Sequence, residues 1–313
     1  MEPSNTARTI TPQALNQWAA EDQAFNLIST LTADHFAQTH LPGAQNACVF
    51  EVSFLEQVTT VTADKQARIV LYGASDNSME AMVAAEKLQR AGYTDISILE
   101  GGLRAWRAAG FPLAGTAVDN PPPPANRLVL ADGFYRIDPD QSLVEWAGRN
   151  PYTKHDGTVG LSTGEIRIEN GLPTGTFTID MNAMENRSLA GDELQPVLID
   201  HLKSDDFFFT RMFPTATFRI ARGRILDEAH LSAPNLGIQG ELTLRGITAG
   251  LDFHATAFQG PDRTIVARAQ IDLDRTRWKV IYGSARFFEN LGMHLVFDHI
   301  SIDVKINAMP AQK

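Results

Sequence analysis

The side chains best suited to nucleophilic chemistry gather in one short loop of this sequence. Residues 71–79 read LYGASDNSM and join an apolar run to a helix-like stretch. Such a loop can present a nucleophile, or it can hold a small anion on backbone N–H groups where a helix begins, with Ser75 and Ser78 assisting. The carboxylate of Asp76 would repel a negatively charged ligand in this loop. The one cysteine, Cys48, lies far along the chain from this loop, and we interpret it as a small buried apolar side chain.

Metal binding is a second chemistry that the side chains could support. His201 stands with Asp200, Asp205 and Asp206 in the densest group of potential ligands. These aspartates are close sequence neighbours without the fixed spacing of a zinc site, and no His-x-His pair or HExxH helix occurs. We therefore expect no metal and no cofactor, and a structural or surface role for His201. His155, followed by an aspartate and a glycine, is typical of a turn.

Composition and charge narrow the class of protein. The chain has 313 residues, of which 43% are hydrophobic and 20% charged, which is enough for two globular domains. A net charge of −10 argues against a nucleic-acid partner and against electrostatic binding to an anionic membrane. The N-terminal residues lack the apolar core of a secretory signal, and no run of about 18 apolar residues could span a bilayer. We expect a cytoplasmic protein without a transmembrane segment.

Four consecutive prolines, Pro121–Pro124, divide the chain into two halves with different patterns. Proline fixes its own φ and donates no hydrogen bond, so this run predicts a stiff, extended spacer. We expect one domain over residues 1–118, a linker over 119–129 and a second domain over 130–313.

Strands alternate with helices in the first half. Short apolar runs at 24–28, 67–72 and 96–99 are typical of buried strands. The stretches 11–20, 76–90 and 102–109 have the pattern of helices. This order predicts a parallel α/β sheet with flanking helices.

Apolar residues recur at every second position in the second half, which indicates antiparallel sheet with one apolar face. Turn signals at 169–171, 245–246 and 259–262 separate the runs. At least seven or eight strands in this length predict a barrel or a sandwich.

The first half resembles the rhodanese family. Residues 40–46 (HLPGAQN) and 99–113 (LEGGLRAWRAAGFPL) match its two most specific segments. The resemblance implies a sulfurtransferase loop whose cysteine accepts sulfur. Here Gly73 or Ser75 takes the cysteine position, so we expect a catalytically inactive module and no enzyme, with sulfurtransferase activity as the open alternative. The degenerate loop comprises Gly73, Ala74, Ser75, Asp76, Asn77 and Ser78.

The second half resembles the YceI-like family. Residues 135–142 (YRIDPDQS), 201–218 (HLKSDDFFFTRMFPTATF), 240–248 (GELTLRGIT) and 277–292 match its ordered motifs. The resemblance implies an all-β, antiparallel, eight-stranded, lipocalin-like barrel that encloses an isoprenoid chain. Residues 185–199 form a longer insertion than the family pattern, and if it covers the mouth, the ligand can differ from that of the isoprenoid binders.

These resemblances together predict a lipid-binding protein of two domains. The barrel would bind an apolar, isoprenoid or fatty ligand, while the rhodanese-like module would dock a protein partner at its loop face or regulate the barrel. A filled barrel that serves as an interaction scaffold stays open, as does a homodimer. Small inward residues at Gly240, Ala255, Ala257, Ala267 and Ala269 would leave room inside. The predicted lumen residues are Trp146, Phe177, Ile179, Phe218, Leu242, Leu244, Phe253 and Trp278.

Overall fold

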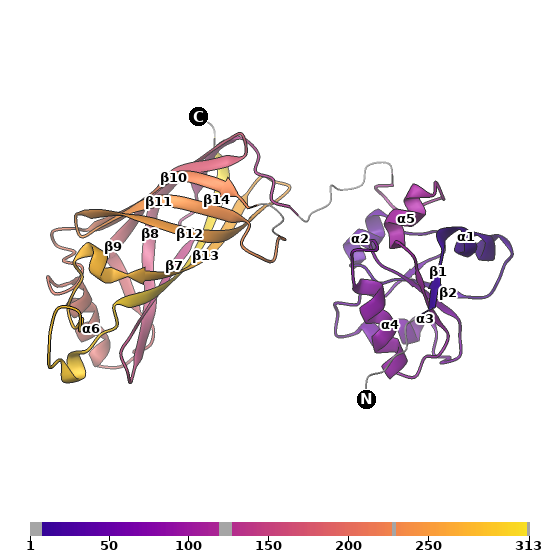
Figure 1. The fold of residues 1–313 in the computed structure, drawn as a ribbon, viewed down its shortest axis with the longest axis horizontal. Coiled ribbons are helices and arrows are strands. Elements are labelled where there is room, and N and C mark those ends of the chain that lie inside the picture. Colours follow the sequence, from indigo (N-terminus) through magenta and orange to yellow (C-terminus); the bar gives the residue numbers. More distant parts are fainter. Residues whose placement is uncertain (1–7, 119–126, 227–229, 312–313) are drawn as a thin grey trace. The chain divides into compact units, whose positions relative to one another are not determined.

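The computed structural model describes residues 8–118, 127–226 and 230–311. The chain forms two compact units, Met1–Pro123 and Pro124–Lys313 (Figure 1). The spacer predicted at 119–129 falls mostly on residues 119–126, which lie outside the described residues. Each unit has its own hydrophobic core.

The first unit is built on a five-stranded sheet in which all paired neighbours are parallel. This confirms the predicted α/β class. In sheet order the strands are β1 (Arg8–Ile10), β5 (Ile96–Leu99), β4 (Ile69–Tyr72), β2 (Asn26–Ser29) and β3 (Gln45–Asn46).

Helices cover both faces of this sheet, as alternation along β4 shows. Ile69 and Leu71 belong to a core shared with α3 and α4, while Val70 and Tyr72 belong to a second core shared with α1 and α5. The sequence pattern missed α2 and α3. The helices are α1 (Pro12–Ala20), α2 (Ala33–Gln38), α3 (Phe54–Val61), α4 (Glu80–Arg90) and α5 (Gly102–Ala108).

The second unit is a closed antiparallel barrel, as predicted. One continuous sheet runs from β13 to β14, and these two strands also pair with each other, which closes the ring. Every pairing in it is antiparallel. The strands are β6 (Gly133–Ile137), β7 (Leu143–Arg149), β8 (Lys154–Glu169), β9 (Leu172–Asn186), β10 (Thr215–Ile225), β11 (Leu236–Leu244), β12 (Ile247–Gln259), β13 (Ile265–Asp274) and β14 (His299–Ala311).

Strands β6 and β7 share one position in the ring, so the sheet has nine strands but the barrel has eight positions. Both strands pair with β8 on one side and with β14 on the other. The turn between them contains Asp138, whose carboxylate accepts the N–H groups of Asp140 and Gln141. An Asx turn of this kind interrupts the strand without opening the barrel.

Two-residue turns fix the register of two hairpins. Asn170 and Gly171 join β8 to β9, and Arg245 and Gly246 join β11 to β12. All four residues have positive φ, which a type I′ turn requires at both central positions. Asparagine and glycine tolerate that conformation well, and the turn signals at 169–171 and 245–246 were therefore informative.

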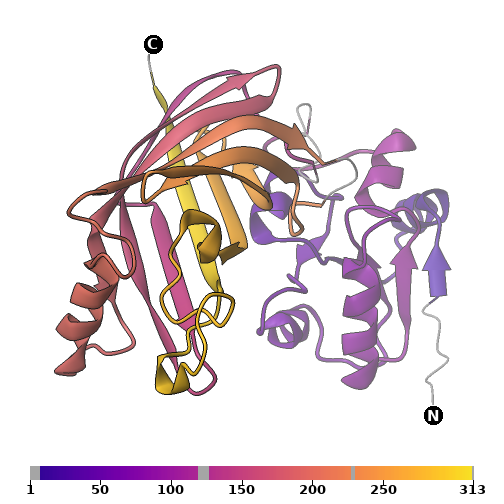
Figure 2. The same cartoon turned by 60° about the vertical axis from the view of Figure 1, so that its left-hand side comes forward.

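Irregular segments gather at one end of the barrel, where β9 ends and β14 begins (Figure 2). One is α6 (Leu194–Lys203), which overlaps the end of the insertion that the sequence indicated at 185–199. The other follows the 3₁₀ helix η1 (Arg275–Trp278) and runs over residues 279–298, including η2 (Gly292–His294); we call 279–298 the strap. In the described part of the chain, no helix combines the length and apolar character needed to cross a membrane.

Candidate functional site

The barrel encloses an apolar cavity of about 320 Å³. Its walls are almost wholly aliphatic and aromatic side chains from every strand position of the ring. Of the predicted lumen residues, the structure places seven on this wall: Trp146, Phe177, Ile179, Phe218, Leu242, Leu244 and Phe253. Their contact with a ligand stays a prediction.

Trp278 is the predicted lumen residue that the structure places elsewhere. It lies in η1, its side chain is fully buried, and its indole N–H donates to the Leu242 carbonyl at 2.8 Å. The period-2 pattern does not extend into a 3₁₀ helix, so its apolar character did not indicate a position facing the lumen. Trp278 supports the strand wall instead.

Small residues and aromatic rings both line the lumen. Ala255, Ala257, Ala267 and Ala269 all line the cavity. Gly240 has another role, because a Cβ there would overlap the ring of Phe218. The Phe218 ring lies 6.3 Å from that of Phe177 and 5.5 Å from that of Phe253, centroid to centroid. These rings form a rigid aromatic wall against which a slim chain could pack.

The end of the barrel opposite α6 is closed by the protein itself. Leu128 and Leu130, which precede β6, are buried in the core, and Leu130 also lines the cavity. The Tyr135 hydroxyl donates to the Ala131 carbonyl at 2.7 Å and accepts from Gln259 at 3.0 Å. This capped end leaves the α6 end as the mouth.

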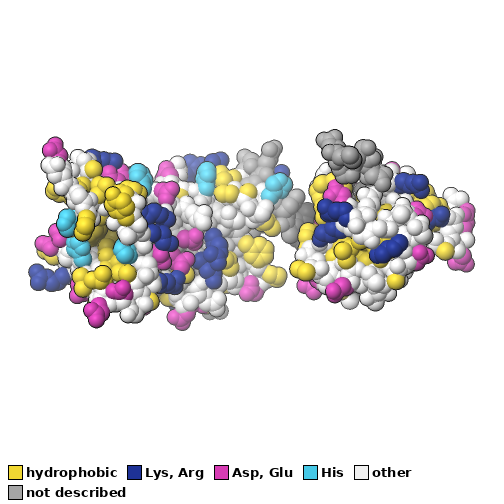
Figure 3. Space-filling model, turned by 90° about the horizontal axis from the view of Figure 1, so that it is seen from below, with side chains coloured by type: hydrophobic (Ala, Val, Ile, Leu, Met, Phe, Trp, Pro, Cys, Tyr) yellow, Lys and Arg dark blue, Asp and Glu magenta, His cyan; other side chains and the backbone are white. Residues whose placement is uncertain are grey.

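Polar groups line the cavity near the mouth. Asn150, Thr153 and His155 come from the β7–β8 hairpin. His155 lies within β8, which corrects its assignment to a turn, and its Nδ1 is 3.3 Å from the Ser188 hydroxyl. These side chains could contact the head of a ligand whose tail lies deeper. The space-filling view shows hydrophobic side chains gathered around a hollow at this end, with histidines among them (Figure 3).

His201 belongs to an aromatic cluster at the mouth. Its ring meets those of Phe207 and Tyr282 edge-on, at 5.0 and 4.7 Å between centroids. Its Nε2 lies 3.4 Å from the Asp206 carboxylate. Within the described residues no group of three or more His, Cys, Asp or Glu side chains is placed to hold a metal ion. The cluster packs α6 and the following loop against the strap.

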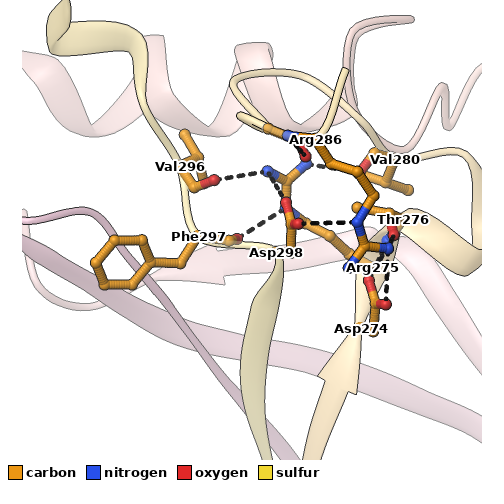
Figure 4. A network of polar contacts seen from close by, with 9 residues as sticks. Asp274, Arg275, Thr276, Val280, Arg286, Val296, Phe297 and Asp298 are labelled. Carbon is orange, nitrogen blue, oxygen red and sulfur yellow. Dashed lines mark hydrogen bonds and ion pairs between the residues drawn. The ribbon is translucent and has the colours of Figure 1, made fainter. Parts of the chain in front are cut away.

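Arg275 is a buried cation beside the cavity, with 1% of its surface exposed. Its guanidinium donates to the carbonyls of Val280, Val296 and Phe297 at 2.6, 3.0 and 3.0 Å (Figure 4). The Asp298 carboxylate lies 3.9 Å away. Burial lowers the pKa of Arg275, and Asp298 opposes that effect. Because its donors already serve backbone carbonyls, Arg275 fastens both ends of the strap and is a poor anchor for an anionic ligand.

A second arginine ties the strap to the end of β13. Arg286 donates to Asp274 at 3.3 Å and to the Thr276 hydroxyl at 2.9 Å, and its Nε lies 3.6 Å from Asp298 (Figure 4). Burial would raise the pKa of Asp274, but hydrogen bonds from Thr276, together with Arg286, lower it below the ordinary value. Sequence reasoning missed this network, because its members become neighbours only when β13 pairs with β14.

The degenerate loop of the first unit is closed on itself. The N–H of Ser75 donates to the Ser78 hydroxyl at 3.0 Å, and that of Asn77 donates to the Ser75 hydroxyl at 3.2 Å. Asp76 is paired with Arg104, so the repulsion expected from its charge is partly offset. Loop amides that bind their own serines are not available to hold an anion.

A carboxylate lies beside Gly73, one of the two residues that the resemblance aligns with the rhodanese cysteine. A Cβ at Gly73 would lie 2.8 Å from Oε2 of Glu80, and that oxygen is buried without a hydrogen-bond partner among the described residues. Glu80 and Arg107 are both near enough to His35 to shift its pKa through their charges, Arg107 downward and Glu80 upward. Burial is the larger influence, and with Arg107 it lowers that pKa.

Two other candidate nucleophiles are unsuitable. Cys48 is buried with 3% of its surface exposed, in agreement with its interpretation as an apolar core side chain. Residues 160–164 (GLSTG) match the G-x-S-x-G pattern of hydrolases, but Ser162 lies inside β8 and its hydroxyl donates to the Thr178 carbonyl at 3.1 Å. The nucleophile elbow of hydrolases requires a strand–turn–helix junction instead.

Family comparisons agree with both resemblances. The YceI-like domain model matches residues 135–308, and the Rhodanese-like domain model matches residues 11–109. Among curated proteins, no sequence matches the chain.

Solved structures resemble each unit. BcnA of Burkholderia cenocepacia is 17% identical over 55% of this chain and 99% of its own, with a TM-score of 0.45. A polyisoprenoid binding domain from Saccharophagus degradans is 12% identical over 58% of this chain and 100% of its own, with a TM-score of 0.40. The rhodanese-like domain of the Anabaena protein Alr3790 is 25% identical over 42% of this chain and 92% of its own, with a TM-score of 0.32.

Proposed function

Because the chain belongs to the YceI-like family through residues 135–308 and carries a rhodanese-like domain over 11–109, we propose that its barrel binds and carries an apolar, isoprenoid or fatty ligand. The observation that carries this proposal is the apolar cavity of about 320 Å³ inside the barrel. Its volume falls in the range of small-molecule sites, roughly 300–1,000 Å³. It weighs against the alternative of a filled barrel that acts as a scaffold.

Burial of hydrocarbon supplies the affinity. Each CH₂ group moved from water into such a lumen gains about 0.8 kcal/mol. A tail can therefore bind without a charged anchor, which agrees with the engagement of Arg275 by three backbone carbonyls. The ligand would place its tail against the Phe177–Phe218–Phe253 wall and its head near Asn150, Thr153 and His155. We infer that an uncharged head is favoured.

The rhodanese-like unit is proposed to be catalytically inactive and to serve docking or regulation. Gly73 and Ser75 supply no thiol, the loop amides bind its own serines, and the Glu80 carboxylate stands over Gly73. A thiolate placed there would face a negative charge, which disfavours it. The burial of Cys48 weighs against the alternative of sulfur transfer through that residue. A protein partner at the loop face, a homodimer and a cytoplasmic location stay predictions.

The test is to extract the purified full-length protein with organic solvent and to identify the extract by mass spectrometry. The delipidated protein is then titrated with a polyprenyl quinone and with a fatty acid of similar length. We expect one apolar molecule per chain and saturable binding, tighter for the quinone. An empty extract together with no binding of either probe would overturn the proposed carrier function.

A further inference from the structure

Large apolar side chains are exposed around the mouth of the barrel. Tyr152 and Met293 have 89% and 88% of their surface exposed, and Leu194 and Val197 of α6 have 60% each. Phe287 and Phe288 of the strap are 49% and 45% exposed. We call these six residues the apolar rim. Exposed apolar groups that gather in one region mark an interaction surface.

The strand pairing places all parts of the apolar rim at the same end. Helix η1 and the strap together connect Asp274 to His299, which face each other across β13 and β14. The turn with Tyr152 joins β7 to β8 at this end, because Ala147 pairs with both Ser301 and Asp156. Helix α6 follows β9 there as well, and Figure 2 shows α6 and the strap together at that end.

The apolar face of helix α6 extends beyond the cavity. Leu198 and Leu202 line the cavity, whereas Leu194 and Val197 are exposed. Leu194 lies one turn before Leu198 on the same face of the helix, so the exposed residues continue the stripe that lines the cavity. The apolar face of α6 therefore runs from the lumen to the outside of the mouth.

From this arrangement we propose that the apolar rim inserts into the surface of a lipid bilayer, so that the ligand passes between bilayer and lumen without crossing water. The proposal rests on the carrier function proposed above. Exposed Phe, Leu and Met residues supply such binding in interfacial anchors, and a tyrosine is suited to the headgroup region. A water-filled gap would cost a hydrocarbon tail about 0.8 kcal/mol for each exposed CH₂.

Charge around the mouth selects the kind of lipid surface. Lys203 and Arg286 stand near the apolar rim, but so do Asp192, Glu193 and Glu289. With a net charge of −10, the whole chain is not attracted to an anionic bilayer. We therefore expect binding to zwitterionic phosphatidylcholine, which has no net charge, with no gain from anionic lipid.

The experiment is flotation of the full-length protein with phosphatidylcholine vesicles, with and without about a third phosphatidylglycerol. The triple variant Phe287→Ser/Phe288→Ser/Met293→Ser is compared with Phe258→Ser/Met309→Ser, which removes apolar residues of similar exposure, 49% and 48%, toward the closed end. We expect the rim variant to lose at least about tenfold in vesicle partition and the control to stay within about twofold. Raising salt from about 0.1 M to about 1 M should not release the wild type.

Ligand titration in solution separates this proposal from the carrier function. The rim variant should bind the polyprenyl quinone as the wild type does, and it should melt at the same temperature. Insertion of the apolar rim into a bilayer is refuted if the wild type fails to float with vesicles, if its binding requires phosphatidylglycerol, or if both variants lose vesicle partition equally. Dimerisation through the apolar rim would also overturn the proposal. It would be shown by a dimer mass in solution for the wild type and a monomer mass for the rim variant. Failure of the wild type to bind the quinone would instead refute the proposed carrier function.

Discussion

The carboxylate of Glu80 stands over Gly73, so close that Oε2 would lie 2.8 Å from a Cβ at that position. The same oxygen is buried. A nucleophile at this site would therefore sit against a negative charge in a poorly solvated place. The proposed inactivity of this unit therefore rests on the surroundings of Gly73 as well as on its lack of a thiol.

Introducing a cysteine at Gly73 should therefore not confer sulfurtransferase activity. We expect Gly73→Cys to show no thiosulfate-to-cyanide sulfur transfer, because Glu80 raises the pKa of the new thiol above its usual value of about 8.5. The pH dependence of alkylation by iodoacetamide measures that pKa. In Gly73→Cys/Glu80→Gln the alkylation midpoint should move to lower pH. Equal midpoints in both variants, or turnover in the single variant, would contradict this account.

Filling the lumen should abolish ligand binding without unfolding the barrel. Ala267 lines the cavity beside Ala257, its partner on the neighbouring strand. Ala267→Phe therefore places a ring where the tail would lie. We expect at least about tenfold weaker binding of a polyprenyl quinone, measured by fluorescence titration, and a stability cost of about 1–3 kcal/mol.

The neighbouring Val266 provides the matched control for Ala267→Phe. It pairs with Phe258, whose side chain is exposed, and thus faces away from the lumen. Val266→Phe adds the same ring on the outside and should leave quinone affinity within about twofold. Equal losses in both variants would mean that the cavity is not where the ligand binds.

The barrel was predictable from sequence because strands and turns are indicated by residues that are close together in the chain. Alternating residues identify strands, and the turns at Asn170-Gly171 and Arg245-Gly246 require positive φ that few residue types accept. Five of the seven predicted residues that line the cavity lie in such alternating runs, whereas Trp278 lies in η1, outside any alternating strand, and does not line the cavity.

The mouth was not predictable, because its contacts join distant segments. Arg275 contacts Val296 and Phe297 only after β13 has paired with β14, and no spacing rule relates these residues. A buried arginine beside an apolar run carried no recognisable signal in the sequence.

Replacing Arg275 should release the strap. Arg275→Met leaves three carbonyls without their donor and Asp298 without its nearest buried cation, which we expect to cost about 3–5 kcal/mol. Hydrogen exchange of strap peptides measures the loss. Arg277→Met, at an exposed arginine that donates to the Gly250 carbonyl, should change exchange much less. Unchanged strap protection in Arg275→Met would show that the network does not hold this segment.

Acid should weaken the first unit through His35. Burial, aided by Arg107, lowers the pKa of His35 in the folded state, whereas an unfolded histidine titrates near about 6.5. As pH falls below that value, the unfolded chain binds a proton that the folded chain resists, so stability declines until the folded pKa is passed. Pulse proteolysis in urea, read on first-unit peptides at about pH 7.5 and about pH 5.5, measures the decline. His35→Gln should flatten it, while His254→Gln, on an exposed face of the barrel, should not. A decline that persists undiminished in His35→Gln would assign the acid sensitivity to another group.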